Sequence, residues 1–213
     1  MRERIVVMIP TWLEAKKFMC HYGDTYETAK AGVGLAECAA RTAGIIASRK
    51  PDLLILAGFA GAYEGRGIQK GETVLVKREN SSDLGSCCGT DFRPLSKAGQ
   101  DPKFNYYDCP GTIPDIFPQV ISNSVNVAAI GRRNNLLMDG AIENMEGAAF
   151  FSVCNAMEVP FLELRTVSNI VGEGPRDWLK EEASELLSEA IIRLIDTLTE
   201  NNNVLCNKAY LPH

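Results

Sequence analysis

The alternation of strand-like and helix-like segments constrains this fold more than any other feature of the sequence. Residues 52–57 form a near-continuous apolar run, and residues 4–9 and 159–167 have the same character. Such runs are typical of strands that are buried on both faces of a sheet. Segments with apolar residues at helical spacing separate the strand-like runs, at 12–20, 35–49, 147–157 and 177–199. The alternation predicts an α/β fold, a three-layer α/β/α sandwich with a central mixed, mainly parallel sheet.

Shorter signals place the remaining elements. Residues 25–30, 71–77 and 125–130 are further strand candidates. We expect Thr11 to cap the first helix, with Glu14 at the capping-box position, and Asp177 to cap the last helix. Residues 79–119 are irregular and contain prolines and aromatic residues, which predicts an excursion from the sheet that forms the rim of a pocket.

Length, charge and cysteine usage bound the class of protein. The 213 residues suffice for one domain with a sizeable core, so we expect a single domain over residues 1–200 and a tail over 201–213. The net charge of −5 argues against a nucleic-acid partner, and no apolar run is long enough to span a membrane. An odd number of scattered cysteines, seven in all, and no signal peptide predict a cytoplasmic protein. With two histidines and no CxxC motif, we expect neither a metal nor a cofactor.

Four short segments that carry polar or small residues lie where strands are expected to end. These segments are residues 11–14, 58–61, 144–147 and 165–169. Ligands of open α/β sheets bind outside the carboxyl ends of the strands. We therefore expect Glu14, Glu146 and Asn169 to converge on one cleft at this edge of the sheet.

Three sequence blocks resemble a known family. GFAGAY at 58–63, NMEGAAFFSVC at 144–154 and VPFLELRTVSN at 159–169 resemble the nucleosidase branch of the purine nucleoside phosphorylase superfamily. The chain is most similar to the futalosine hydrolases of the alternative menaquinone pathway, and is also similar to methylthioadenosine/S-adenosylhomocysteine nucleosidases. The resemblance implies hydrolysis of the N-glycosidic bond of a purine nucleoside by a homodimer or higher homo-oligomer.

The resemblance assigns two carboxylates to the chemistry. Glu14 matches the glutamate that activates water, and Glu146 matches the one that accepts hydrogen bonds from the ribose hydroxyls, with Met145 lying flat against the sugar. A carboxylate at Glu146 would also favour the cationic ribose of the transition state. Both residues have a structural alternative, because a glutamate at either position can cap the helix that follows or begins there.

Asn169 is the position that departs from the adenine-cleaving relatives, which have Ser-Asp where this chain has Ser168 and Asn169. An amide cannot protonate a leaving purine, but its NH2 group can donate to a carbonyl. Asn169 therefore suits a 6-oxopurine such as hypoxanthine, the base of futalosine. The alternatives are an asparagine that only caps a turn, or an inactive member of the family.

The turn of Gly58, Phe59, Ala60 and Gly61 allows the backbone to approach a substrate closely. In phosphorylases of the superfamily this turn and nearby arginines bind phosphate. Here residues 53–57 contain no arginine and Phe59 is bulky, so we expect water to be the nucleophile.

Three supporting roles remain open. Arg165 lies within an apolar strand, where we expect it to support the site through Glu163 or Glu146. The aromatic residue that stacks on the purine either comes from residues 104–107 or is absent. Trp178 either covers the substrate or packs against a helix.

Four functions fit the sequence to different degrees. Hydrolysis of a 6-oxopurine nucleoside such as futalosine fits best. Asn169 argues against a methylthioadenosine/S-adenosylhomocysteine nucleosidase, and the arginine-free strand argues against a purine nucleoside phosphorylase. A non-catalytic nucleoside-binding protein would not need both Glu14 and Glu146. The group on the ribose five-prime carbon is left open, because irregular segments build that part of the pocket.

Overall fold

The computed structural model describes residues 4–88, 91–95, 106–128 and 139–200. Four helices lie in these ranges: α1 (Trp12–Tyr22), α2 (Leu35–Arg49), α3 (Gly147–Ala156) and α4 (Lys180–Glu200). The strands are β1 (Ile5–Ile9), β2 (Glu27–Lys30), β3 (Leu53–Ala62), β4 (Thr73–Ser81), β5 (Gly85–Cys88), β6 (Asp91–Pro94), β7 (Tyr106–Asp108), β8 (Gln119–Ser124), β9 (Ile142–Asn144) and β10 (Phe161–Ile170). The expected tail at 201–213 lies outside the described residues.

Eight of these strands form one mixed sheet, ordered β10-β4-β8-β9-β3-β1-β2, with β7 pairing β4. The strands β1, β2, β3 and β10 run parallel to one another, whereas β4 and β9 pair antiparallel to β10 and β3. Because β10 pairs with β3 as well as with β4, the strands β3, β10, β4, β8 and β9 close into a ring. The mixed, mainly parallel sheet is confirmed, but it is more closed than the open sandwich that the sequence predicted.

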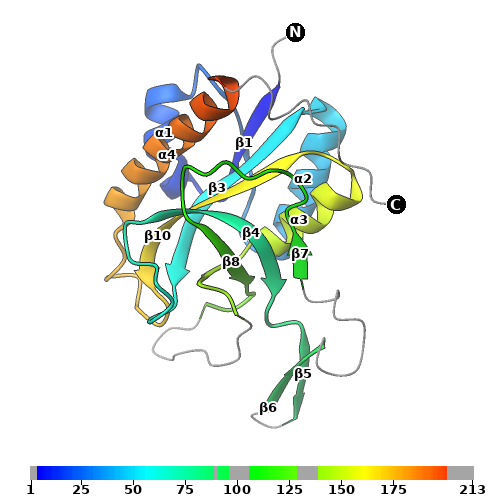
Figure 1. Ribbon diagram of the computed structural model, residues 1–213, viewed down its shortest axis with the longest axis vertical. Helices are drawn as coiled ribbons and strands as arrows, with labels where there is room; N and C mark the ends of the chain where they lie inside the picture. The colour runs from blue at the N-terminus through cyan, green and yellow to red at the C-terminus, as the bar shows by residue number, and fades with distance from the viewer. Residues whose placement is uncertain (1–3, 89–90, 96–105, 129–138, 201–213) are drawn as a thin grey trace.

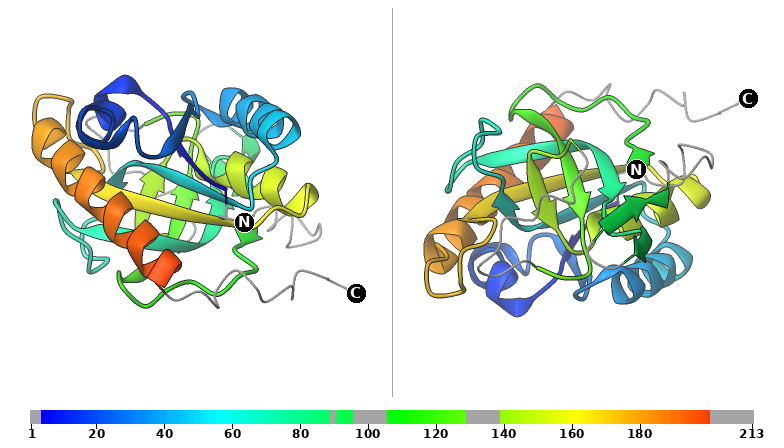
Figure 2. Two further views of the ribbon diagram at one scale, coloured as in Figure 1. Left: turned by 90° about the horizontal axis from the view of Figure 1, so that it is seen from above. Right: turned by 90° about the horizontal axis from the view of Figure 1, so that it is seen from below.

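Helices cover both faces of the sheet, as the three-layer prediction requires (Figures 1 and 2). An apolar cluster that includes Phe18, Ile55 and Ile191 lies under α1 and α4. A second cluster, which includes Phe150 and Phe151, lies under α2 and α3. Every residue of β3 is buried, because this strand lies between the two layers. The two clusters fix β3 and β10 in the centre of the molecule, and these are the strands that carry most of the candidate site.

Three sequence predictions about elements were wrong, one of which is the turn at 58–61, since these residues belong to β3. Residues 125–128 form no strand, and the strand of this region is β8, which lies earlier in the chain. The pattern of apolar residues did not reveal β8, because three of its buried residues are polar: Ser122, Asn123 and Ser124. Asp177 does not cap the last helix, which begins three residues later at Lys180.

The excursion expected at 79–119 exists, but it begins after β4 ends at Ser81. Strands β5 and β6 form a separate two-stranded hairpin that projects from the body of the protein (Figure 1). No helix among the described residues is long and apolar enough to cross a membrane.

Candidate active site

A cavity of about 260 Å³ lies at the carboxyl ends of β1, β3 and β10. Glu14, Glu146 and Asn169 all line it, so the predicted convergence on one cleft is confirmed. Met145, Ser168, Phe59, Ala60 and Gly61 line it as well. Gly58 lies behind this lining, where a Cβ would come within 2.9 Å of Glu14 and 2.7 Å of Arg165. The cavity thus gathers residues from four segments that are far apart in the sequence.

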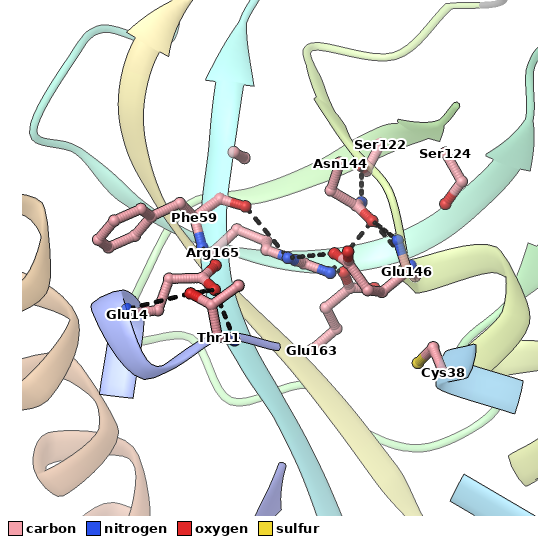
Figure 3. Close-up of polar contacts among 12 residues, drawn as sticks. Thr11, Glu14, Cys38, Phe59, Ser122, Ser124, Asn144, Glu146, Glu163 and Arg165 are labelled. Carbon is pink, nitrogen blue, oxygen red and sulfur yellow. Dashed lines mark hydrogen bonds and ion pairs between the residues drawn. The ribbon is translucent and has the colours of Figure 1, made fainter. Parts of the chain in front are cut away.

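Glu14 serves both as a cap of α1 and as a wall of the cavity. Its Oε2 accepts hydrogen bonds from the backbone N–H of Thr11 at 2.9 Å and from the Thr11 hydroxyl, which completes a capping box. Its Oε1 accepts from the backbone N–H of Phe59 at 2.7 Å. Burial raises the pKa of Glu14, and these hydrogen bonds oppose that rise. The cap and the catalytic position are therefore not alternatives, since the cap holds this carboxylate in place (Figure 3).

Glu146 precedes α3 but makes no capping hydrogen bond. Asn144 caps in its place, because its Oδ1 accepts from the backbone N–H groups of Glu146 and Gly147. The Glu146 carboxylate instead accepts from the N–H of Gly34 at 3.3 Å and from Arg165 at 3.2 Å. Glu146 therefore occupies the N-cap position of α3, as the capping alternative expected, but its side chain does not form the capping hydrogen bond. Its side chain lines the cavity, and only 5% of the residue surface stays exposed.

Arg165 is fully buried on β10 and joins several parts of the site (Figure 3). Its Nε donates to Glu163 at 2.7 Å, and its Nη1 donates to Glu146 at 3.2 Å. The same guanidinium donates to the carbonyl of Phe59 and to Oδ1 of Asn144, both at 3.1 Å. The sequence left Glu163 and Glu146 as alternative partners, and the structure shows that Arg165 binds both.

A further buried carboxylate, Glu79, lies behind this network. It accepts from Asn144 Nδ2 at 2.6 Å and from the Ser124 hydroxyl at 2.7 Å. Burial raises its pKa well above the ordinary value, and repulsion from the neighbouring Glu163 raises it further. A Cβ on Gly147 would collide with the carboxylates of both Glu79 and Glu163. Gly147 therefore lets α3 begin directly above this pair.

Asn169 lines the cavity, and both ends of its amide make hydrogen bonds. Nδ2 donates to the carbonyl of Ile170 at 3.1 Å, and Oδ1 accepts from the Ser168 hydroxyl at 2.9 Å. Because a carbonyl can only accept, the Ile170 contact fixes which end of the amide is nitrogen. One N–H of Asn169 then remains for a ligand. Gly61 faces this group, where a Cβ would lie 3.0 Å from Nδ2.

The turn predicted at residues 58–61 is wrong, because these residues lie within β3 and pair with β10. The ring of Phe59 belongs to the apolar cluster beneath α1 and α4, so it packs into the core as well as lining the cavity. Its N–H is taken by Glu14 and its carbonyl by Arg165. Glu14 and Arg165 therefore bind both backbone polar groups of Phe59.

Sequence reasoning missed Glu143 and left Trp178 undecided. Both line the cavity. The stacking aromatic residue that the sequence placed at 104–107 is not found among the described residues of that range: Tyr106 and Tyr107 lie on β7 and do not line the cavity. Phe104 lies outside the described residues. None of the described residues between 79 and 119 lines the cavity, so the expected rim is wrong for the described part of that stretch. The one signal that could have found Glu143 is its place two residues before Met145.

Comparison with known proteins agrees with this fold and site. Residues 126–200 match the family model of the phosphorylase superfamily. The futalosine hydrolase of Thermus thermophilus is 30% identical over 191 residues, which cover 81% of this chain and 82% of that protein. The structure of a futalosine hydrolase mutant from Helicobacter pylori is 15% identical with a TM-score of 0.74, covering 92% of this chain and 99% of that one. The apo 5′-methylthioadenosine nucleosidase of Arabidopsis thaliana is 17% identical with a TM-score of 0.76, covering 97% of each chain.

The fold is that of the phosphorylase superfamily. The sequence match extends over most of both chains, so the protein belongs to the futalosine hydrolase family within it.

Proposed function

We propose that this chain hydrolyses the N-glycosidic bond of a 6-oxopurine nucleoside, with futalosine as the substrate to test first. The reaction would then belong to menaquinone biosynthesis. The observation that carries the proposal is one cavity lined by a buried carboxylate at Glu14, a second at Glu146 and an amide donor at Asn169. The three groups match the three needs of the reaction: a base for water, an anchor for ribose and a donor to the departing purine.

Glu14 acts as the general base. Water attacks the anomeric carbon, the bond from that carbon to the purine nitrogen breaks, and Glu14 accepts the proton that the water loses. General base catalysis of this kind contributes about a hundred- to ten-thousandfold. The hydrogen bonds from Thr11 and Phe59 hold both carboxylate oxygens in a fixed orientation, so little reorganisation is needed when the water reacts.

Glu146 binds the ribose hydroxyls, and Met145 contacts the face of the sugar. The anomeric carbon develops positive charge as the bond breaks, and the nearby carboxylates stabilise that charge in a site shielded from water. Arg165 is paired with Glu146 on the buried side, so it supports the carboxylate rather than the substrate.

Asn169 donates its remaining N–H to the purine that departs with the electron pair of the broken bond. A 6-oxopurine offers an acceptor at its six position, where adenine offers a donor. Ser168 supports this arrangement by holding the carbonyl end of the Asn169 amide. The Trp178 ring, which also lines the cavity, is placed to cover the base.

Water rather than phosphate is the nucleophile. The described residues that line the cavity include four carboxylates, at Glu14, Glu143, Glu146 and Glu173, and neither lysine nor arginine. A phosphate dianion placed among these carboxylates would be repelled, and no lysine or arginine among the described lining residues is available to bind it.

Release of free purine tests the proposal. Futalosine, inosine and methylthioadenosine should be assayed with and without phosphate, with Glu14→Gln as the inactive control. We expect hypoxanthine to be released from futalosine without phosphate. Preference for methylthioadenosine would indicate a methylthioadenosine/S-adenosylhomocysteine nucleosidase instead. A need for phosphate would indicate a purine nucleoside phosphorylase, and binding without turnover would indicate a non-catalytic nucleoside-binding protein.

We further propose that the protein acts in the cytoplasm as a homodimer or higher homo-oligomer. Leu13 and Val33 support an oligomer, because these apolar side chains line the cavity and are 39% and 49% exposed. Light scattering during gel filtration should show a mass at least twice that of the 23.3 kDa chain.

A further inference from the structure

Glu143 lies in the cavity and has no part in the steps above. It is on β9, next to Asn144, and only 8% of the residue surface is exposed. Its Oε2 accepts a hydrogen bond from the Tyr63 hydroxyl at 2.7 Å. Among the described residues no donor reaches its other oxygen, Oε1. This oxygen is therefore available to accept a hydrogen bond from a ligand in the cavity.

Glu143 faces the same end of the cavity as Asn169. A Cβ on Gly61 would lie 3.0 Å from Nδ2 of Asn169 and 3.6 Å from Cγ of Glu143, so the two side chains flank one backbone position. Glu143 pairs across the sheet with Gly61, which fixes this arrangement through the backbone. Glu14 lies beside Gly58, which is three residues earlier along β3, and beside Arg165, which in turn binds Glu146. The base, rather than the ribose, therefore meets Glu143.

We propose that Glu143 accepts a hydrogen bond from N1–H of the 6-oxopurine and so determines the choice of base. This inference rests on the proposed function, because it assigns the substrate's base to this end of the cavity. A 6-oxopurine carries a hydrogen on N1, whereas N1 of adenine is an acceptor. An ionised carboxylate only accepts, so it pairs with the first base and opposes the second.

Glu143 removes an ambiguity that Asn169 leaves. An amide has both a donor and an acceptor end, so Asn169 distinguishes the bases only while Ser168 and Ile170 hold its orientation. Glu143 has no donor end when ionised. Together the two residues present a donor to the six-oxo group and an acceptor to N1–H, which is the complement of hypoxanthine and of guanine.

Inhibition by free bases tests Glu143 without involving the group on the ribose five-prime carbon. The inhibition constants of hypoxanthine, 1-methylhypoxanthine and adenine should be measured against futalosine hydrolysis for the wild type, Glu143→Gln and Glu143→Ala. The wild type should bind hypoxanthine at least tenfold more tightly than the other two bases. Glu143→Gln should bind hypoxanthine and adenine within a few-fold of each other, because its amide can turn either end to N1.

Glu143→Ala separates hydrogen bonding from steric exclusion of the methyl group. It should bind hypoxanthine and 1-methylhypoxanthine equally, since it lacks both the acceptor and the bulk. Glu173→Gln is the matched control: it removes another carboxylate of the cavity whose oxygens are already held by Lys70 and by the N–H of Ile170. It should keep the wild-type ranking of the three bases. Thermal unfolding of each variant shows whether it is folded.

The outcomes separate this inference from the proposed function. Wild-type protein that does not release hypoxanthine from futalosine contradicts the function itself. Two results would contradict the role of Glu143 alone, provided that the wild type hydrolyses futalosine. One is that hypoxanthine does not inhibit the wild type. The other is that both folded Glu143 variants keep the wild-type ranking of the bases.

Discussion

The proposed selectivity of the site depends at the residue scale on the NH2 group of Asn169. Asn169→Asp would place acceptor oxygens against the six-oxo group when the carboxylate is ionised. A mismatch between two buried acceptors costs about 1–3 kcal/mol. At 1.4 kcal/mol per factor of ten, we expect the preference for 6-oxo over 6-amino substrates to fall by roughly ten- to a hundredfold.

The measurement for Asn169→Asp is the ratio of kcat/KM for matched 6-oxo and 6-amino nucleosides in both proteins. A ratio that stays the same in a folded variant would show that Asn169 does not read the base.

The ionisation of Glu14 sets a limit on the pH at which the enzyme works. A general base accepts a proton only in its ionised form, and burial raises the pKa of Glu14 above the ordinary 4.5. We therefore expect kcat/KM to fall on acidification at a pH above 4.5, where an exposed glutamate would still be ionised. The profile should be measured with a substrate that does not titrate in this range, and an acid limb at or below 4.5 would contradict the role.

At the scale of elements, the first turn of α1 couples helix capping to the site. Thr11→Ala removes the side chain that accepts from the N–H of Glu14 and donates to its carboxylate. Loss of an N-cap of this kind costs about 0.5–2 kcal/mol of stability. We also expect kcat to fall, because the carboxylate loses one of the groups that orient it.

Denaturant unfolding and steady-state kinetics check Thr11→Ala together. Thr11→Ser is the matched control, since it keeps the hydroxyl and should keep both stability and kcat near the wild type. Loss of stability with an unchanged kcat would mean that the cap does not position Glu14.

The sequence predicted most elements because local patterns determined them. The apolar residues of β1, β3 and β10 and the capping box at Thr11 specify their own structures. The strand β8 escaped prediction because its buried residues Ser122, Asn123 and Ser124 are polar. Their hydrogen-bond partners lie elsewhere in the sequence: Ser124 donates to Glu79, Ser122 accepts from Asn144, and Asn123 accepts from Asn80. A single sequence does not show such pairing.

The candidate site could be predicted in part for the same reason. Glu14, Met145, Glu146 and Asn169 lie in segments whose spacing and resemblance identified them. Glu143 and Glu79 were not found, because their significance comes from where β9 and β4 lie in the sheet. The local residue pattern does not distinguish them from exposed glutamates.

For the whole molecule, the buried carboxylates make stability depend on pH. Glu79 and Glu163 are both fully buried, and burial raises the pKa of each. Oε2 of Glu163 is buried without a donor among the described residues, so we expect a proton to be shared between the two carboxyl groups. The folded chain then binds a proton that the unfolded chain releases above pH 4.5.

A raised pKa in the folded state gives stability that is fully present below the unfolded pKa and is lost as pH rises. We expect the free energy of unfolding to fall as pH increases from about 4.5 toward the raised pKa of Glu79. Glu79→Gln keeps a neutral donor beside Glu163 and should remove this part of the slope. Urea unfolding at a series of pH values measures it, with the exposed Glu181→Gln as control, and equal slopes in the wild type and Glu79→Gln would refute the shared proton.

The position of β10 has a consequence for how the chain folds as it is synthesised. Leu54 of β3 pairs with Phe161 of β10, so β3 leaves the ribosome long before its neighbour exists. Until β10 arrives, β3 and β4 each have an edge with unpaired backbone groups, and such edges pair readily with other chains. Pairing between distant segments is also slow to form. A nascent chain that stops before β10 lacks Arg165 and Asn169, and we expect it to aggregate more readily than the full chain.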